Sequence, residues 1–427
     1  MKKILCVLLA VLLVGSVFAA CETEKAPAET TSVSAYKSKG EYTELTYKLS
    51  WEEINKFPIK TSDMSIDEAR QLCIDFFRYA KKAQWIPDDT WEFSHFDDSG
   101  ADTLYAGVVY GGLPYIGGSG SNIFRLFDYM DPETGVVDIK AATLYPEAFG
   151  NQCAQGAYVG WSRVINSAEY EGTPAMTNIH KFYPVGGYTY DRIEYLTKWD
   201  NQYGTDEVVK EQLGEQELYE CYAQMKKGDG IVYYTSAGHV AMIATDPVVV
   251  RHEDGTIDQG QSYVTVIDQT PTYETYTTEA GQSYQCERNI DAKWTFAYMR
   301  EHNYLPFTFA EWLGEDPIEE TEINYSHEGE TITLKQLTSA KATCNYHIYD
   351  LYAEVYDKWG NQVLKLANRC KWASNYQASL NLKPNALNTV WGDPDDLTAG
   401  GDYTVKVYCQ LGTGERPTLW EGKLIVE

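Results

Sequence analysis

Residues 150–164 read GNQCAQGAYVGWSRV, in which Cys153 is flanked by two glutamines and begins a segment with helical spacing of apolar residues. A cysteine in the first turn of a helix has its thiolate favoured by unpaired backbone N–H groups and the helix dipole. Small neighbours leave room for a substrate, and the Gln152 amide can donate a hydrogen bond near a developing oxyanion. The apolar stripe of this predicted helix, about 153–168, consists of Ala154, Ala157, Tyr158, Trp161, Val164, Ile165 and Ala168. The pattern predicts a nucleophilic thiol.

A thiolate nucleophile needs a base, and His239 is the strongest candidate among the seven histidines. It follows Gly238 at the start of a predicted strand, 239–245, where a sheet could fix its imidazole. A third polar residue should orient the ring and select its tautomer. Asp268, near the end of the predicted strand 262–270, is best placed for this role, and Gln269 is the alternative.

The elements around these residues are helices first and then a meander of strands. Ser65 and Glu68 have the spacing of a capping box before a predicted helix at about 65–84. Residues 91–112 predict a hairpin with a turn at 97–100. Further along, the pattern predicts a short helix in NIFRLFDYM (122–130), a helix near 205–226, a turn at Gly228-Asp229 and a strand at 231–235.

The order of these motifs resembles that of the NlpC-type cell-wall cysteine peptidases of the papain-like superfamily. The matching motifs, which span about 130 residues, are Gly112-Leu113-Pro114-Tyr115-Ile116-Gly117-Gly118, Cys153, Lys227-Gly228-Asp229 and Gly238-His239-Val240. The resemblance implies a papain-like α+β fold with Cys153 as nucleophile, His239 as base and Asp268 as the residue that orients the imidazole. It also implies that Tyr115 lies beside the oxyanion and substrate pocket, and that neither a metal nor a cofactor is needed.

The chain departs from the pattern of that family at two places. The family usually has Asp-Cys-Ser-Gly, whereas this chain has Gln152-Cys153-Ala154-Gln155-Gly156, so an acidic group that could hold a substrate amine is missing. In addition, residues 119–150 separate the glycine motif from the cysteine, where the family commonly has only a few residues. The insertion is expected to reshape the cleft, and recognition of a free amine stays open.

The N-terminus has the features of an export signal. Two lysines precede an apolar run that is too short to span a bilayer comfortably, and Phe18-Ala19-Ala20-Cys21 resembles the lipobox of bacterial lipoproteins. We therefore expect a lipoprotein signal peptide at 1–20, lipidation of Cys21 and a flexible tether at 21–44 that holds the protein at the extracytoplasmic face of the membrane. The alternative is an ordinary cleavable signal with a chance cysteine.

The rest of the chain divides into a predicted papain-like hydrolase domain at 45–315 and, after an acidic linker, an immunoglobulin-like β-sandwich at 322–427. The sandwich is expected to be antiparallel, with ETITLKQL (330–337) as one of its strands. Beyond Cys6 and Cys21, seven of the nine cysteines remain. This odd number argues for at least one free thiol, and one disulfide among Cys344, Cys370 and Cys409 stays open.

These features favour a lipid-anchored cysteine hydrolase that cleaves peptide or amide bonds, with peptidoglycan stem peptides as the expected substrate. The formal net charge of −27 would repel phosphate backbones, so nucleic acid is not an expected partner. Two alternatives remain open. One is transglutaminase-like acyl transfer by the same residues, and the other is an inactive surface-binding or adhesion lipoprotein.

Overall fold

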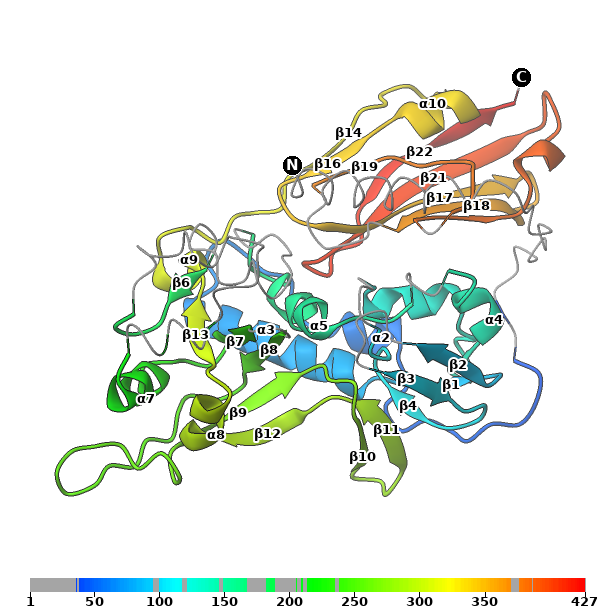
Figure 1. The fold of residues 1–427 in the computed structure, drawn as a ribbon. Helices are drawn as coiled ribbons and strands as arrows, with labels where there is room; N and C mark the ends of the chain where they lie inside the picture. Colours follow the sequence, from blue (N-terminus) through cyan, green and yellow to red (C-terminus); the bar gives the residue numbers. More distant parts are fainter. Residues whose placement is uncertain are drawn as a thin grey trace, which may run out of the picture.

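The computed structural model describes residues 36, 38–94, 100–116, 121–145, 149–166, 182–188, 205, 209, 213–234, 238–369, 376–385 and 387–426. The predicted signal peptide, Cys21 and most of the predicted tether lie outside these residues. The described chain is an α+β protein with more sheet than helix (Figure 1). Within it, no helix is both long enough and apolar enough to cross a bilayer.

The longest helix of the described chain, α3 (Ile66–Lys82), confirms the helix predicted at 65–84. It begins with a capping box in which the side chains of Ser65 and Glu68 each bond the other residue's backbone N–H, which satisfies donors that the first turn leaves unpaired. One face is buried through Leu72, Cys73, Phe76 and Phe77, while charged residues occupy the other face. A short helix, α2 (Trp51–Ile54), precedes it.

A five-stranded sheet lies at one end of α3, in the order β10-β11-β4-β1-β5 (Figure 1). Its strands are β1 (Gln84–Pro87), β4 (Tyr110–Gly111), β5 (Val136–Val137), β10 (Tyr273–Thr277) and β11 (Ser283–Glu287). The predicted hairpin is confirmed as β2 (Trp91–Ser94) paired with β3 (Ala101–Leu104), although most of its turn lies outside the described residues. The helix predicted within 122–130 is the 3₁₀ helix η1 (Ile123–Asp128), and α4 (Ile139–Ala142) follows β5.

A six-stranded antiparallel sheet forms the centre of the molecule, in the order β12-β9-β8-β7-β13-β6. Its strands are β6 (Tyr183–Pro184), β7 (Gly230–Tyr234), β8 (Gly238–Ile243), β9 (Tyr263–Asp268), β12 (Ile290–Thr295) and β13 (Leu305–Thr308). The predicted strands at 231–235, 239–245 and 262–270 are confirmed as the neighbours β7, β8 and β9. The short helices of this region are α7 (Glu215–Ala223), α8 (Phe296–Glu301) and α9 (Ala310–Leu313).

Two predicted helices are shorter in the structure than in the sequence pattern. The helix that begins at Cys153 is α5 (Cys153–Trp161), so the expected end near 168 is wrong. The second helix was predicted from about 205, but α7 begins only after Gly214. Between 205 and 212 the structure describes just residues 205 and 209. All nine residues of α5 are buried, because the helix lies between α3 and the C-terminal sheet (Figure 1).

The C-terminal region contains two sheets, a six-stranded one in the order β15-β22-β21-β17-β18-β20 and a three-stranded one in the order β14-β16-β19. Their strands are β14 (Ile323–Tyr325), β15 (Thr331–Thr333), β16 (Ala342–Cys344), β17 (Ile348–Asp357), β18 (Gln362–Arg369), β19 (Gln377–Ala378), β20 (Asn388–Trp391), β21 (Tyr403–Leu411) and β22 (Thr418–Ile425). The region also contains α10 (Leu334–Ser339) and the 3₁₀ helix η4 (Pro394–Asp396).

Three expectations for this region need correction or limits. Residues 330–337 do not form one strand, because a Thr333–Gln336 capping box starts α10 directly after β15. The larger sheet is not wholly antiparallel, since β15 pairs with β22 in parallel. Cys344 is a free thiol, and Cys370 lies outside the described residues, so a disulfide between Cys370 and Cys409 stays a prediction.

Buried polar contacts join the C-terminal sheet to α5 and η1. The Tyr158 hydroxyl on α5 lies 2.7 Å from His347 Nε2, and Ser162, just after α5, is hydrogen-bonded to the Tyr349 hydroxyl. Next to them, Arg125 of η1 forms a buried ion pair of 3.2 Å with Asp350 of β17. The helix that carries Cys153 therefore has the central sheet on one side and the C-terminal sheet on the other.

Candidate active site

Cys153 is the first residue of α5, and its position is fixed by the chain that leads into the helix. Gly150 has a φ of +113°, a left-handed value that favours glycine, and its hydrogen atoms face Ile116 where a Cβ would lie 2.8 Å away. Asn151 then forms a parallel bridge with Tyr115. Gln152 is extended at the N-cap, and the helix begins at the cysteine. The Cys153 Sγ lies 4.0 Å from the carbonyl oxygen of Gly238, next to His239.

His239 and Asp268 come from neighbouring strands of the central sheet. Ala241 of β8 lies opposite Asp268 of β9, so His239, two residues earlier on β8, is the diagonal neighbour of Asp268 on the same face. The His239 Nε2 lies 2.9 Å from Asp268 Oδ2. The imidazole is 15% exposed, whereas the carboxylate is fully buried. The pairing of two strands thus brings together residues 29 positions apart in the sequence.

Asp268 is held by a residue that the sequence reasoning missed. The backbone N–H of Asn289 donates to Asp268 Oδ1 at 2.8 Å, and its side-chain amide donates to Oδ2 at 3.0 Å. These bonds compensate the burial of the carboxylate and leave its Oδ2 directed at His239. No sequence motif marks Asn289, because asparagine is common wherever a strand begins or a turn ends.

The electrostatic environment favours the protonated form of His239. Burial of the ring lowers its pKa, but hydrogen bonds to Asp268 and Cys153 and the negative charge of Asp268 outweigh burial and raise the pKa to about 10. A base that holds its proton firmly is suited to accept the proton that a neighbouring thiol gives up. The three side chains can therefore form a thiolate–imidazolium pair oriented by a carboxylate.

Three aromatic rings lie around the imidazole. The ring of His239 lies 6.5 Å from that of Tyr233, 6.2 Å from that of Trp294 and 6.5 Å from that of Tyr304, centroid to centroid. Trp294 and Tyr304 are buried. These rings limit the rotation of the imidazole and exclude water from its bond to Asp268, and the sequence reasoning did not identify them.

The remaining predicted site residues are Tyr115, Gln152 and Gln269, and none of them bonds the His239 imidazole in the hydrogen bonds described. Tyr115 is buried beside Asn151, two residues before Cys153, and its N–H donates to the carboxylate of Glu287. Gln152 is the N-cap residue of α5, but within the described residues its side chain makes no capping hydrogen bond. Gln269 is directed away from the imidazole, because its amide bonds Lys81 and the carbonyl oxygen of Leu113. Asp268, not Gln269, is therefore the hydrogen-bond partner of His239.

The segment that carries Tyr115 is fixed by Arg288 and by an obligatory glycine. Arg288 donates to the carbonyl oxygens of Gly111 and Leu113. Gly112, with a φ of +58°, lies against the guanidinium, where a Cβ would come within 2.1 Å of it. Gly117 and Gly118, the last residues of the glycine motif, lie outside the described residues.

No protein-family model matches the chain, and no curated protein matches it significantly. The site is therefore interpreted from its geometry and chemistry.

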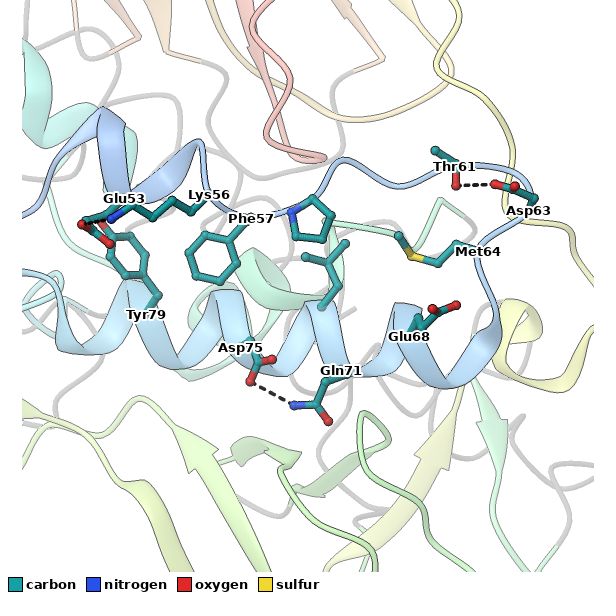
Figure 2. A pocket seen from close by; sticks show the side chains of 12 residues that line it. Glu53, Lys56, Phe57, Thr61, Asp63, Met64, Glu68, Gln71, Asp75 and Tyr79 are labelled. Carbon is teal, nitrogen blue, oxygen red and sulfur yellow. Dashed lines mark hydrogen bonds and ion pairs between the residues drawn. The ribbon is translucent and has the colours of Figure 1, made fainter.

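Within the described ranges, no cluster of three or more His, Cys, Asp or Glu residues could hold a metal ion. A groove of about 670 Å³ lies between residues 53–64 and α3, and Cys153 is not among the residues that line it (Figure 2). We place the reactive centre at Cys153 because the geometry of three converging side chains, unlike the size of a hollow, specifies chemistry.

The raised pKa of His239 leads to a prediction on pH dependence. Asp268→Asn removes the charge that raises this pKa, so the imidazolium should lose its proton at lower pH. The alkaline limb of the pH profile of kcat/KM, near pH 10 in the native protein, should then move down by at least about one pH unit, toward the ordinary histidine value. Asp246→Asn, at an exposed carboxylate, is the matched control and should leave the limb in place. An unshifted limb in Asp268→Asn would contradict the assignment.

Proposed function

We propose that this chain is a cysteine hydrolase that cleaves peptide or amide bonds, built on a papain-like α+β fold. The observation that carries the proposal is the convergence of Cys153 from the start of α5, His239 from β8 and Asp268 from β9. A nucleophile, a base and an orienting carboxylate in hydrogen-bonded series are the components of covalent acyl chemistry.

The proposed cycle has two halves. The Cys153 thiolate attacks the carbonyl carbon, and the resulting oxyanion is stabilised by N–H groups at the start of α5. As the C–N bond breaks, the His239 imidazolium gives its proton to the leaving amine and a thioester remains. Water, deprotonated by the now neutral imidazole, then attacks the thioester and releases the acid and the thiol.

Peptidoglycan stem peptides are the substrate that we propose, on the strength of the resemblance to NlpC-type peptidases. The glycine motif that precedes Tyr115, the Gly228-Asp229 turn and the Gly238-His239 strand start support this reading. Gln152 stands where that family usually has an acidic residue, so we propose substrates whose recognition does not require a carboxylate at this position.

The location and the C-terminal region belong to the same proposal. A lipid on Cys21 and the tether that follows would hold the enzyme at the outer face of a bacterial membrane, next to the cell wall. For the C-terminal sheets we propose an immunoglobulin-like sandwich, which the paired strands β17, β18 and β21 and their shared apolar core support.

The test is product analysis with purified muropeptides. Incubation with the protein should produce new free carboxyl and amino termini, identified by mass spectrometry, and Cys153→Ala should produce none. An added primary amine should be incorporated into the product only if the enzyme performs acyl transfer. Absence of any new product from peptides or muropeptides would favour a surface-binding protein and overturn the proposal.

A further inference from the structure

The groove on the far side of α3 is separate from the candidate active site. Its α3 wall consists of positions that recur on one stripe of the helix, namely Glu68, Gln71, Leu72, Asp75 and Tyr79. Cys73 and Phe77, which face Gly160 of α5, lie on the opposite side of the same helix. Figure 2 shows Tyr79 and Glu68 beside the segment that contains Phe57 and Met64, with Gln71 and Asp75 at the other edge of the helix.

The shape of the groove suits an extended chain. The stripe from Glu68 to Tyr79 covers eleven helical positions, or roughly 16 Å at the rise of an α-helix. An extended peptide covers about 3.3 Å per residue, so roughly five residues would fill that length. The floor and the middle of the groove are apolar, with Leu72 buried and Phe57 and Met64 half-buried.

The wall of the groove opposite α3, residues 53–64, is held in place by contacts on its outer side. The Lys60 ammonium donates to the carbonyl oxygen of Glu319 and lies 3.8 Å from the centre of the Tyr346 ring. Beside it, the N–H of Ser62 donates to the Glu320 carboxylate at 2.9 Å, and the Arg163 guanidinium donates to the carbonyl oxygen of Pro58 at 3.2 Å. These contacts hold the wall away from α3, so the groove exists before any ligand binds.

The charge of the groove is negative at one end. Lys56 is already paired with Glu53, and Asp75 with Arg78. In contrast, neither Glu68 nor Asp63, at the other end of the groove, forms an ion pair with a described residue.

Local hydrogen bonds keep Glu68 ionised. The hydroxyl and the amide of Ser65 donate to its carboxylate and lower its pKa, against the opposing negative charge of Asp63. Asp63 accepts from the Thr61 hydroxyl at 2.6 Å. An apolar groove that ends at two carboxylates complements an apolar chain with a cation.

We propose that this groove binds an extended peptide of about five residues with apolar side chains and a lysine or arginine at the Glu68 end. The cation lies between Glu68 and Asp63, and the apolar side chains contact Phe57, Met64 and Leu72. The site is distinct from Cys153 and requires no catalysis, so the proposal stands or falls separately from the hydrolase function.

The test uses the full chain and two short peptides. One is acetyl-Lys-Leu-Ala-Leu-Phe-amide, and the other has norleucine in place of lysine. Each peptide is also tested with its sequence reversed, which places the first residue at the other end. Isothermal titration calorimetry at low ionic strength should show tighter binding of a lysine peptide, by about threefold to fivefold, the range of an exposed ion pair. Equal binding of the lysine and norleucine peptides, or no binding of any of them at millimolar concentration, would overturn the proposal.

Matched variants separate this groove from the general attraction of a basic peptide to an acidic protein. Glu68→Gln removes one charge and keeps the capping box, because glutamine serves equally well at that position. It should reduce the preference for the lysine peptide over the norleucine peptide, and the Asp63 carboxylate accounts for what remains. Asp254→Asn removes the same charge from a distant exposed turn and should leave the affinity unchanged. Equal effects of the two variants would mean non-specific attraction and would refute a specific site. Hydrolysis by Glu68→Gln should equal that of the native protein.

Discussion

Cys153→Ala should lower kcat/KM for hydrolysis by at least about a thousandfold, and His239→Ala should lower it by a similar factor. The first variant lacks the atom that forms the thioester, and the second lacks both the base and the acid of the cycle. In the proposed cycle the two side chains act as one unit, since the thiol must transfer its proton to the imidazole, which Asp268 holds at 2.9 Å. The double variant should therefore be no worse than either single variant. Initial rates on one defined peptide substrate provide the measurement.

The control for these variants is Cys344→Ser. Cys344 is also a buried free thiol, but it lies in the C-terminal region on β16. This variant should retain activity, and iodoacetamide should inactivate it at the same rate as the native protein by modifying Cys153. Hydrolysis that persists in Cys153→Ala, or losses in the two single variants that simply multiply in the double variant, would refute the mechanism.

Sequence patterns predicted the elements whose causes are local. The capping box and the apolar stripe that follows it specify α3 without reference to the rest of the chain. In the same way, β-branched and apolar runs between turns specify β7, β8 and β9. A Thr333–Gln336 capping box was equally readable, yet the region was predicted as strand because β-branched residues precede it. That error was avoidable, since the N-terminal signal of a helix was present.

The sequence predicted Cys153, His239 and Asp268 as residues of the candidate site, but it did not predict how they are placed relative to one another. Cys153, His239 and Asp268 each stand at the end of an element, and their types allow one chemistry. The register that brings Asp268 diagonal to His239 depends on how two strands pair, and sequence spacing alone does not give it. Asn289 and Trp294 come from the next strand of the sheet and its entry, and nothing in their local sequence connects them to a histidine fifty residues earlier.

The early end of α5 has its cause in the C-terminal region. Tyr158 and Ser162 place hydroxyl groups in the buried interior, where His347 and Tyr349 of the C-terminal region form hydrogen bonds with them. Tyr376 adds a bond of 3.0 Å to the carbonyl oxygen of Asn166, beyond the helix end. These contacts exist only after the C-terminal sheet has packed, so a stripe of apolar residues that continued to 168 could not reveal that the helix stops at Trp161.

The attachment of the C-terminal sheet to η1 provides the second large expected effect. The side chain of Asp128 is only 6% exposed, forms ion pairs with Lys365 at 2.7 Å and with Arg369, and accepts a hydrogen bond of 3.1 Å from the Tyr352 hydroxyl. Asp128→Ala leaves the buried Arg369 with a hydrogen bond of 2.9 Å to the Tyr352 hydroxyl and a longer ion pair, 3.6 Å, to Asp350. Removal of one partner of a buried ion pair costs about 3–5 kcal/mol, because the other charge stays out of water. The free energy of unfolding, measured in urea, should fall by that amount, whereas Asp395→Asn, at an exposed position, should change it by less than about 0.5 kcal/mol.

The pH dependence of this effect identifies its electrostatic origin. Burial raises the pKa of Asp128, but Arg369 and Lys365 outweigh burial and hold it well below the ordinary value. A carboxyl whose pKa is lowered on folding stabilises the protein above its unfolded pKa, about 3.9, and loses that contribution as the pH falls further. The difference in unfolding free energy between the native protein and Asp128→Ala should therefore be constant near neutral pH and shrink below about pH 4. A difference that persists undiminished in acid would instead indicate lost packing.

If the ion pairs also position α5 through the C-terminal sheet, kcat should fall in Asp128→Ala under conditions in which the protein is still folded.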